Sequence, residues 1–358
     1  TASLRVAGRR VQEVIQKYGR LAVEETIRWY MDYADQLVQR ELEKLPKGSF
    51  EAEDWIDGDG LTDDPIPVRV KVTIDEERFL IDYTGTAPQT RGPVNCTLPA
   101  TISAARKVFL GVINPHLAVN EGCFRRLDIV VPEGTVFHAT HPAPTSIYWD
   151  SMIFAEDLVC KALAPHMPDR LIAGHFLSTC GLVLSVRRDD QRTVILVEPQ
   201  AGGWGAGKLK DGERGLVASS DGDTYMIPVE VCEQRFPILV ERYEFNTEEG
   251  GHGQFRGGNG LIRDYRIVGT GGSLTATFGR FRYPPWGVAG GQPGTCNRAE
   301  LHVPGDPAPS IRGKIARFPL RGGHLVRLVT GVGGGYGDPV RRDPRRVLED
   351  VLNGFVTP

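Results

Sequence analysis

Glycine is the residue that most restricts what this chain can fold into. The sequence has 43 glycines and 25 prolines among 358 residues, about 12% and 7%, against averages of about 7% and 5%. Many of the glycines fall in three clusters, at residues 202–207, 250–260 and 331–337. Glycine and proline mark tight turns and interrupt helices and strands. We therefore expect loops and turns to carry much of the fold, above all in the second half of the chain.

The rest of the composition is that of a globular protein. Hydrophobic residues make up 41% and charged residues 24%, and 42 basic against 45 acidic residues give a net charge of −3. This balance offers no basic surface for nucleic acid. No apolar run is long enough to span a bilayer, and the first ten residues do not resemble a signal peptide. The six cysteines lie at least 20 residues apart, which predicts reduced thiols and a cytoplasmic protein. From the charge balance and the lack of a long apolar run, we predict that it binds neither nucleic acid nor membrane.

Helical periodicity dominates the first 46 residues. Apolar side chains recur at steps of three and four over residues 3–18, and Gly19 would end this helix. The same spacing continues at once to Pro46, so a second helix is expected after a very short connection. Two helices joined in this way predict an antiparallel helical hairpin. We take residues 1–46 as a linker-like helical hairpin.

The rest of the chain predicts a mixed α+β protein. Alternating apolar residues indicate a β-hairpin over residues 66–83, and helices are expected at 97–112 and 149–163 with a strand at 127–131 between them. Further strands are expected at 182–197 (a pair around an Asp189-Asp190 turn), 238–245, 261–267, 273–278, 300–303 and 325–330. A terminal helix follows Asp343, with Val347, Leu348, Val351 and Leu352 expected as its buried stripe and Gly354 as its stop. The predicted domains are 47–200, α+β, and 201–358, a glycine-rich antiparallel β region with this C-terminal helix.

The first glycine cluster is the strongest candidate for chemistry. Gly202, Gly203 and Gly205 surround Trp204, and Asp211 follows shortly after them. Glycines let backbone N–H groups converge on an anion, and a nearby carboxylate can act as a base. The functional interpretation is a substrate-binding wall with Asp211 as its catalytic group. The alternative is a bulged β-turn that places one tryptophan in the core.

The other candidates are weaker on their residues alone. Arg256, in the cluster at 250–260, could bind a carboxylate or phosphate through two hydrogen bonds, although it could equally hold a hairpin connection together. The cluster at 331–337 lacks the helix that should follow a dinucleotide fingerprint. His138 and His141 precede two prolines and are not expected on a helix, so we predict no metal ligands in this chain.

Several motifs, taken in order, resemble the hydantoinase B / 5-oxoprolinase family. They are DYTGTAPQ at 82–89, GPVN at 92–95, NEGCFR at 120–125, GGWGA at 202–206, FRGG at 255–258, PPWG at 284–287 and GGGYGDP at 333–339. The resemblance spans nearly the whole chain. It implies the B-type subunit of a multisubunit ATP-dependent hydrolase that opens cyclic amides such as hydantoins, 5-oxoproline or lactams. In such an enzyme a hydantoinase A-like partner would bind ATP and phosphorylate the substrate, and a divalent metal would stabilise the oxyanion.

The family pattern also extends beyond what this sequence contains. Members carry a long N-terminal half with His- and Asp-rich motifs that look like metal ligands, and none of these motifs is found here. We therefore expect ATP and the metal to be held mainly outside this chain. We also expect the chain to be the C-terminal part of a B-type subunit whose N-terminal half is its second partner. Two alternatives stay open: one component of an ATP-dependent ketone carboxylase acting on acetone or acetophenone, and a non-catalytic scaffold.

Overall fold

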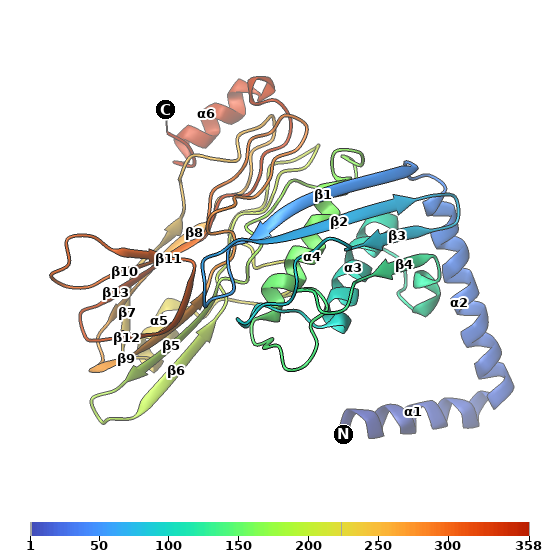
Figure 1. Ribbon diagram of the computed structural model, residues 1–358, viewed down its shortest axis with the longest axis horizontal. Helices are drawn as coiled ribbons and strands as arrows, with labels where there is room; N and C mark the ends of the chain where they lie inside the picture. Colours follow the sequence, from blue (N-terminus) through green and yellow to red (C-terminus); the bar gives the residue numbers. More distant parts are fainter. Residues whose placement is uncertain (1, 223, 358) are drawn as a thin grey trace.

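The computed structural model describes residues 2–222 and 224–357, and over these residues it has the predicted mixed α+β architecture. A sheet covered by helices forms one end of the molecule, and two antiparallel sheets form the other (Figure 1). Long extended loops run between the two ends, with the C-terminal helix beside them. No helix among the described residues is both long and apolar enough to cross a membrane.

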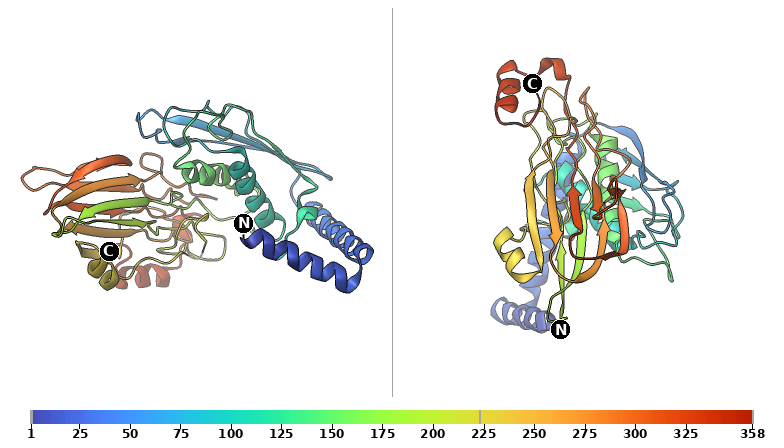
Figure 2. Two further views of the ribbon diagram at one scale, coloured as in Figure 1. Left: turned by 90° about the horizontal axis from the view of Figure 1, so that it is seen from below. Right: turned by 90° about the vertical axis from the view of Figure 1, so that its left-hand side faces the viewer.

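The first two helices form as predicted, but they do not lie antiparallel. Helix α1 (Ala2–Tyr18) and helix α2 (Arg20–Leu42) meet in an L at the edge of the molecule (Figures 1 and 2). Only Gly19, with a φ of +83°, separates them. One residue cannot reverse the chain and also place two helix axes the 8–10 Å apart that side-by-side packing needs. The predicted helical hairpin is therefore wrong in its geometry.

The helix-covered sheet has the strand order β1-β2-β3-β4. Its strands are β1 (Gly48–Ile56), β2 (Ile66–Ile74), β3 (Phe79–Asp82) and β4 (Leu127–Val130), and only the β3–β4 pair is parallel. Burial alternates along β2 as its sequence predicts, with Val68, Val70 and Val72 in the core. Helices α3 (Leu98–Ile113) and α4 (Tyr148–Leu163) cover this inner face (Figure 2).

The other two sheets share one hydrophobic core. The five-stranded sheet has the order β11-β10-β13-β8-β7, and the four-stranded sheet has the order β12-β9-β5-β6. Their strands are β5 (Gly181–Arg187), β6 (Thr193–Glu198), β7 (Ile238–Phe245), β8 (Leu261–Ile267), β9 (Gly271–Thr277), β10 (Arg298–His302), β11 (Ser310–Arg312), β12 (Lys314–Leu320) and β13 (Leu325–Val329). Strands from both sides of residue 200 pair in the four-stranded sheet. The predicted domain limits stay a prediction.

The terminal helix α6 (Pro344–Leu352) begins as predicted, but the face that it turns toward the core is not the predicted one. Asp343 caps it by accepting a hydrogen bond from the backbone N–H of Arg345 at 2.9 Å. Three of the four residues of the expected buried stripe are exposed, Val347 at 41%, Leu348 at 59% and Leu352 at 76%, whereas Val351 is half-buried and Asp350 is the buried residue of this helix. The remaining helical elements are α5 (Val229–Arg235) and two short 3-10 helices (Glu121–Phe124 and Pro339–Arg341).

Candidate functional site

The glycine clusters come together as one layer of extended backbone. The layer is formed by residues 202–207, 250–260, 287–294 and 331–337, which run side by side beneath α6 (Figure 1). Hydrogen bonds join different segments directly: Gly203 N donates to Gly331 O at 3.0 Å, Gly258 N to Trp204 O at 2.8 Å, and Gly333 N to Gly258 O at 3.0 Å. We call these four segments the glycine layer.

Glycine is required in this layer because backbones touch where a side chain would stand. A Cβ placed on Gly203 would lie 2.0 Å from the carbonyl oxygen of Gly258, and a Cβ on Gly333 would lie 2.2 Å from that of Trp204. Real Cβ atoms essentially never come closer than 3.0 Å to such atoms. The glycines therefore permit close approach of extended segments.

The predicted substrate-binding wall lies inside this layer, and the backbone N–H groups of Gly202, Gly203 and Trp204 already donate within the chain. The backbone N–H of Gly202 donates to Leu216 O at 2.7 Å, and that of Trp204 donates to Glu213 O at 2.9 Å. The indole of Trp204 donates to Val217 O at 3.0 Å. Gly202, Gly203 and Gly205 are buried. This arrangement favours the packing interpretation over an anion-binding loop, and a role of these residues in substrate binding stays a prediction.

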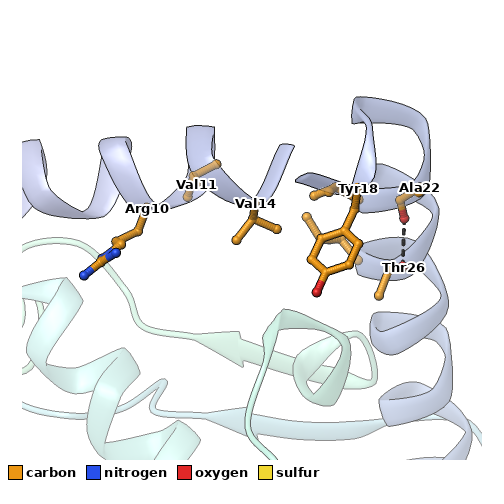
Figure 3. Close-up of a pocket in the computed structure, with 8 residues that line it drawn as sticks. Arg10, Val11, Val14, Tyr18, Ala22 and Thr26 are labelled. Carbon is orange, nitrogen blue, oxygen red and sulfur yellow. Dashed lines mark hydrogen bonds between the residues drawn. The ribbon is translucent and has the colours of Figure 1, made fainter. Parts of the chain in front are cut away.

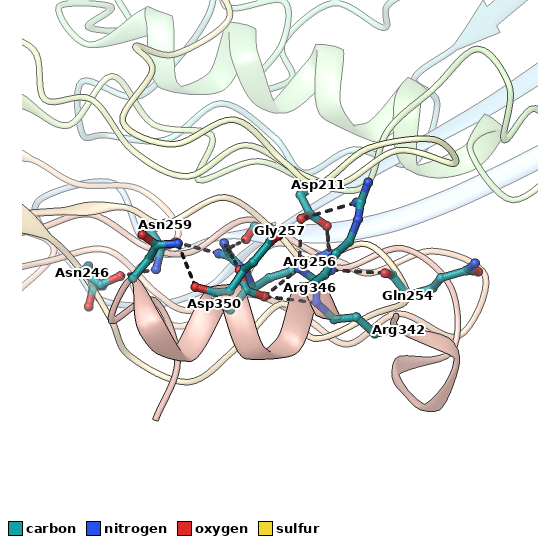
Figure 4. Close-up of polar contacts among 11 residues, drawn as sticks. Asp211, Asn246, Gln254, Arg256, Gly257, Asn259, Arg342, Arg346 and Asp350 are labelled. Atoms are coloured by element: carbon teal, nitrogen blue, oxygen red, sulfur yellow. Dashed lines mark hydrogen bonds and ion pairs between the residues drawn. The ribbon is translucent and has the colours of Figure 1, made fainter. Parts of the chain in front are cut away.

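Asp211 and Arg256 are brought together in an ion cluster under α6, and Arg346 lies at its edge, 3.8 Å from Asp211 (Figure 4). Arg342 donates to both carboxylate oxygens of Asp211, at 2.8 and 3.0 Å, and to Asp350 at 2.6 Å. Arg256 donates to Asp350 at 3.1 Å through its guanidinium and to Asp211 at 2.7 Å through its backbone N–H. We call Asp211, Arg256, Arg342 and Asp350 the clasp, because it fixes α6 to the glycine layer.

The clasp keeps Asp211 ionised. Burial alone would raise the pKa of this carboxyl group, but the hydrogen bonds from Arg342 and from the backbone of Arg256 outweigh burial and lower the pKa below its usual value. A carboxylate held in this way is a weak proton acceptor. Arg256 does bind a carboxylate, as its chemistry suggested, but the carboxylate is that of Asp350. A catalytic role for Asp211 stays a prediction.

One pocket of about 340 Å³ opens beside the clasp. Its lining combines charged residues of the clasp with His252 and the apolar Val347 and Val356. Both arginines of the clasp contribute to the wall, but their guanidinium groups already pair with carboxylates of the chain.

A second buried charge network was not predicted from the sequence. Arg280 donates to Asp54 at 2.8 Å and to Asp157 at 2.5 Å, and Trp286 donates to Asp157 at 2.9 Å. The network joins β1, α4 and the loop after β9. Arg280 is separated from both carboxylates by 100 residues or more, so no spacing in the sequence could reveal it. The one sequence feature that pointed to this network was the motif PPWG at 284–287, which contains Trp286.

His175 lies against this network. Its Nδ1 is 3.8 Å from Asp157 Oδ1, and its Nε2 has no hydrogen-bond partner among the residues that the structure describes. Burial, reinforced by the positive charges of Arg280 and Lys107, lowers the pKa of His175 to about 3. The imidazole is therefore neutral at physiological pH.

Within residues 2–222 and 224–357, no group of three or more His, Cys, Asp or Glu side chains is arranged to hold a metal ion. These residues offer no ligand set for the divalent metal that the family resemblance implies. That the metal is held mainly outside this chain stays a prediction, and we derive no chemical step through it.

The comparisons with known proteins are decisive about the family. The model of the family described as Hydantoinase B/oxoprolinase matches residues 1–339. The chain belongs to this family. One curated relative of this chain is the putative B-type subunit of a D-/L-hydantoinase from Pseudomonas sp. (strain NS671). It is 30% identical, and the match covers 99% of this chain and 62% of that protein. The chain therefore spans less than two thirds of that relative.

Two solved structures share the fold. The ATP-dependent caprolactamase of Pseudomonas jessenii superposes with a TM-score of 0.83 at 24% identity, covering 99% of this chain and 62% of the caprolactamase chain. A nucleotide-free acetone carboxylase superposes with a TM-score of 0.83 at 18% identity, covering 97% of this chain and 53% of the carboxylase chain. At these identities the similarity establishes the fold of the hydantoinase B family chain and nothing more specific.

Proposed function

We propose that this chain is part of the B-type subunit of an ATP-dependent enzyme that opens cyclic amides, such as hydantoins, 5-oxoproline or lactams. The observation that carries the proposal is the family match over residues 1–339. The names of two curated relatives, the putative B-type subunit of a hydantoinase and a caprolactamase beta subunit, support the choice of cyclic amides.

The proposed reaction begins with a poor electrophile. A cyclic amide carbonyl resists attack by water, and transfer of the γ-phosphoryl group of ATP to the amide oxygen, with release of ADP, makes its carbon reactive. A hydantoinase A-like partner would supply the ATP site. ATP would be held mainly by polypeptide other than this chain, because the N–H groups of Gly202, Gly203 and Trp204 already donate within the chain. Any metal would also be held mainly elsewhere, because the described residues offer no group of three or more metal-ligating side chains.

The direct test is turnover by an assembled complex. The chain is co-expressed with an A-type subunit and with the part of a B-type subunit that it does not match, and ADP release is followed with a hydantoin, 5-oxoproline or caprolactam. Cyclic-amide-dependent ADP release that accompanies ring opening supports the proposal. ADP release that requires acetone or acetophenone together with bicarbonate, and that is absent with the cyclic amides, would replace it with the ketone carboxylase.

Within such a complex, the structure favours a supporting role for the glycine layer and the clasp. The amides of Gly202, Gly203 and Trp204 are bonded inside the chain, and both oxygens of Asp211 accept from Arg342. In a supporting role, Trp204→Ala and Asp211→Asn lower the stability of the complex but leave kcat per assembled complex within about twofold. A fall in kcat of about 100-fold or more at unchanged assembly would instead place these residues in the reaction chamber.

A further inference from the structure

The apolar side chains of helix α1 do not pack into a hydrophobic core. Across its 17 residues no side chain is buried, and large apolar residues stand in solvent, among them Leu4 at 77% exposure and Tyr18 at 60%. The first half of α2 continues this surface with Leu21, Ile27 and Trp29, which are 75%, 55% and 63% exposed. These two segments form an arm at the edge of the molecule (Figure 1).

Such an arm needs a contact to be stable. Isolated helices of this length are marginal in water, and most helical stability in proteins comes from packing of the apolar face. Gly8 weakens α1 further, by about 1 kcal/mol relative to alanine. Contiguous exposed apolar surface of this kind marks an interaction site.

The inner corner of the L is shaped to receive another segment. It forms an open pocket of about 650 Å³, almost entirely apolar, lined by Arg10, Val11, Val14, Tyr18, Ala22, Val23, Thr26 and Ile27. Figure 3 shows Arg10, Val14 and Tyr18 pointing to the same side of α1, into the corner between the two helices. We call these eight residues the elbow.

The charge around the elbow adds a second requirement. Helix α1 carries Arg5, Arg9, Arg10 and Lys17 against a single acid, Glu13. Arg10 pairs with Glu13 at 2.7 Å, which is the one ion pair of α1 in the described part of the chain. Around the α2 half of the elbow, Arg20 and Arg28 are balanced by Glu24 and Glu25, so the excess positive charge lies on α1. A partner that covers the elbow should therefore present an apolar surface with an acidic rim facing α1.

The lengths of the relatives point to the source of that partner. The match covers 62% of the Pseudomonas hydantoinase relative and 62% of the caprolactamase chain, so 38% of each is polypeptide without a counterpart in these 358 residues. We propose that the elbow is the docking surface for polypeptide of this kind, which contributes an apolar face and an acidic rim. The inference rests on the family and on the length comparison, and it does not depend on which substrate is turned over.

The test uses trypsin as a probe of α1. The 358-residue chain is digested alone and with a separately expressed segment, the 38% of the Pseudomonas jessenii caprolactamase chain that it does not match. Cleavage after Arg9, Arg10 and Lys17 is followed by mass spectrometry. We expect these bonds to be cut first in the chain alone and at least tenfold more slowly with the segment.

Two variants of α1 make the test specific. Val14→Asp places a charge in the elbow, and Gln16→Asp places the same charge two residues further along, away from it. Protection by the segment should be lost in Val14→Asp and kept in Gln16→Asp. Fusing the segment to the chain in one polypeptide gives a second measurement that does not require the segment to fold alone, with the same pattern expected.

Three results would overturn the proposal. Equal cleavage of α1 with and without the segment, in both the mixture and the fusion, would mean that this polypeptide does not cover the elbow. A chain that sediments as a dimer by itself, and as a monomer with Val14→Asp, would assign the elbow to a second copy. Protection of α1 by phosphatidylglycerol vesicles but not by the segment would assign it to a lipid surface. None of these results bears on cyclic-amide turnover, so the two proposals fail independently.

Discussion

Replacing Gly203 by alanine should disrupt the glycine layer more than its size suggests. The new Cβ would lie 2.0 Å from Gly258 O, 2.7 Å from Gly333 N and 2.8 Å from Gly331 O, and all three neighbours are backbone atoms that cannot rotate away. The segments must therefore separate by about 1 Å to reach an allowed contact.

That displacement has a cost that can be worked out from the hydrogen bonds. The bonds Gly203 N to Gly331 O and Gly333 N to Gly258 O are 3.0 Å long, and Gly258 N to Trp204 O is 2.8 Å long. Lengthening each by about 1 Å takes it out of hydrogen-bonding range. A buried group left without a partner costs about 1–3 kcal/mol, so three disrupted bonds predict a loss of about 3–9 kcal/mol in the free energy of unfolding.

Urea unfolding followed by tryptophan fluorescence measures this loss. Gly111→Ala is the matched control, because its Cβ has nothing within 4 Å and it lies in α3, where alanine should stabilise the helix by up to about 1 kcal/mol. A Gly203→Ala variant within about 0.5 kcal/mol of the parent protein would refute the close-packing argument.

Three further predictions concern α6 and the buried carboxyl groups. Asp350→Ala should remove a buried partner from two arginines of the clasp and cost about 3–5 kcal/mol, seen as faster hydrogen exchange in α6, whereas the exposed Glu349→Ala should not. Leu352→Ser should change unfolding free energy by less than about 0.5 kcal/mol, because this side chain is 76% exposed; a larger loss would mean that it is buried. Burial raises the pKa of Asp150 to about 6, so stability should fall by about 2 kcal/mol as pH rises from 4 to 7, and urea unfolding of Asp150→Asn should lack this part of the pH dependence.

Strong periodicity allowed most elements to be predicted. Strands β7 and β8 have the predicted bounds, and β2 lies within the hairpin predicted over residues 66–83, because its apolar residues alternate without interruption. Strand β1 was not predicted, because Phe50, Ala52 and Asp54 do not form a regular apolar face. Asp54 is buried there through its ion pair with Arg280, 226 residues away, and a local pattern cannot carry that information.

The prediction of which face of α6 is buried was wrong for a related reason. A pattern of valines and leucines indicates which face of a helix is apolar, but not whether that face meets the core. Here the ion pairs of Asp350 decide the orientation, and its partners Arg256 and Arg342 belong to other segments. At the candidate site, the sequence grouped Asp211 with the glycines of the layer, and it could not foresee that Arg342 would occupy both oxygens of this carboxylate.

The glycine layer also bears on how the molecule moves. Segments with so much glycine and no regular secondary structure would ordinarily be taken for the most pliable part of a protein. Here each segment is held on more than one side by main-chain bonds to its neighbours, as strands are held inside a sheet. This region should therefore be a rigid connection between the two ends of the molecule. Its amide protons should exchange with deuterium more slowly than those of α1.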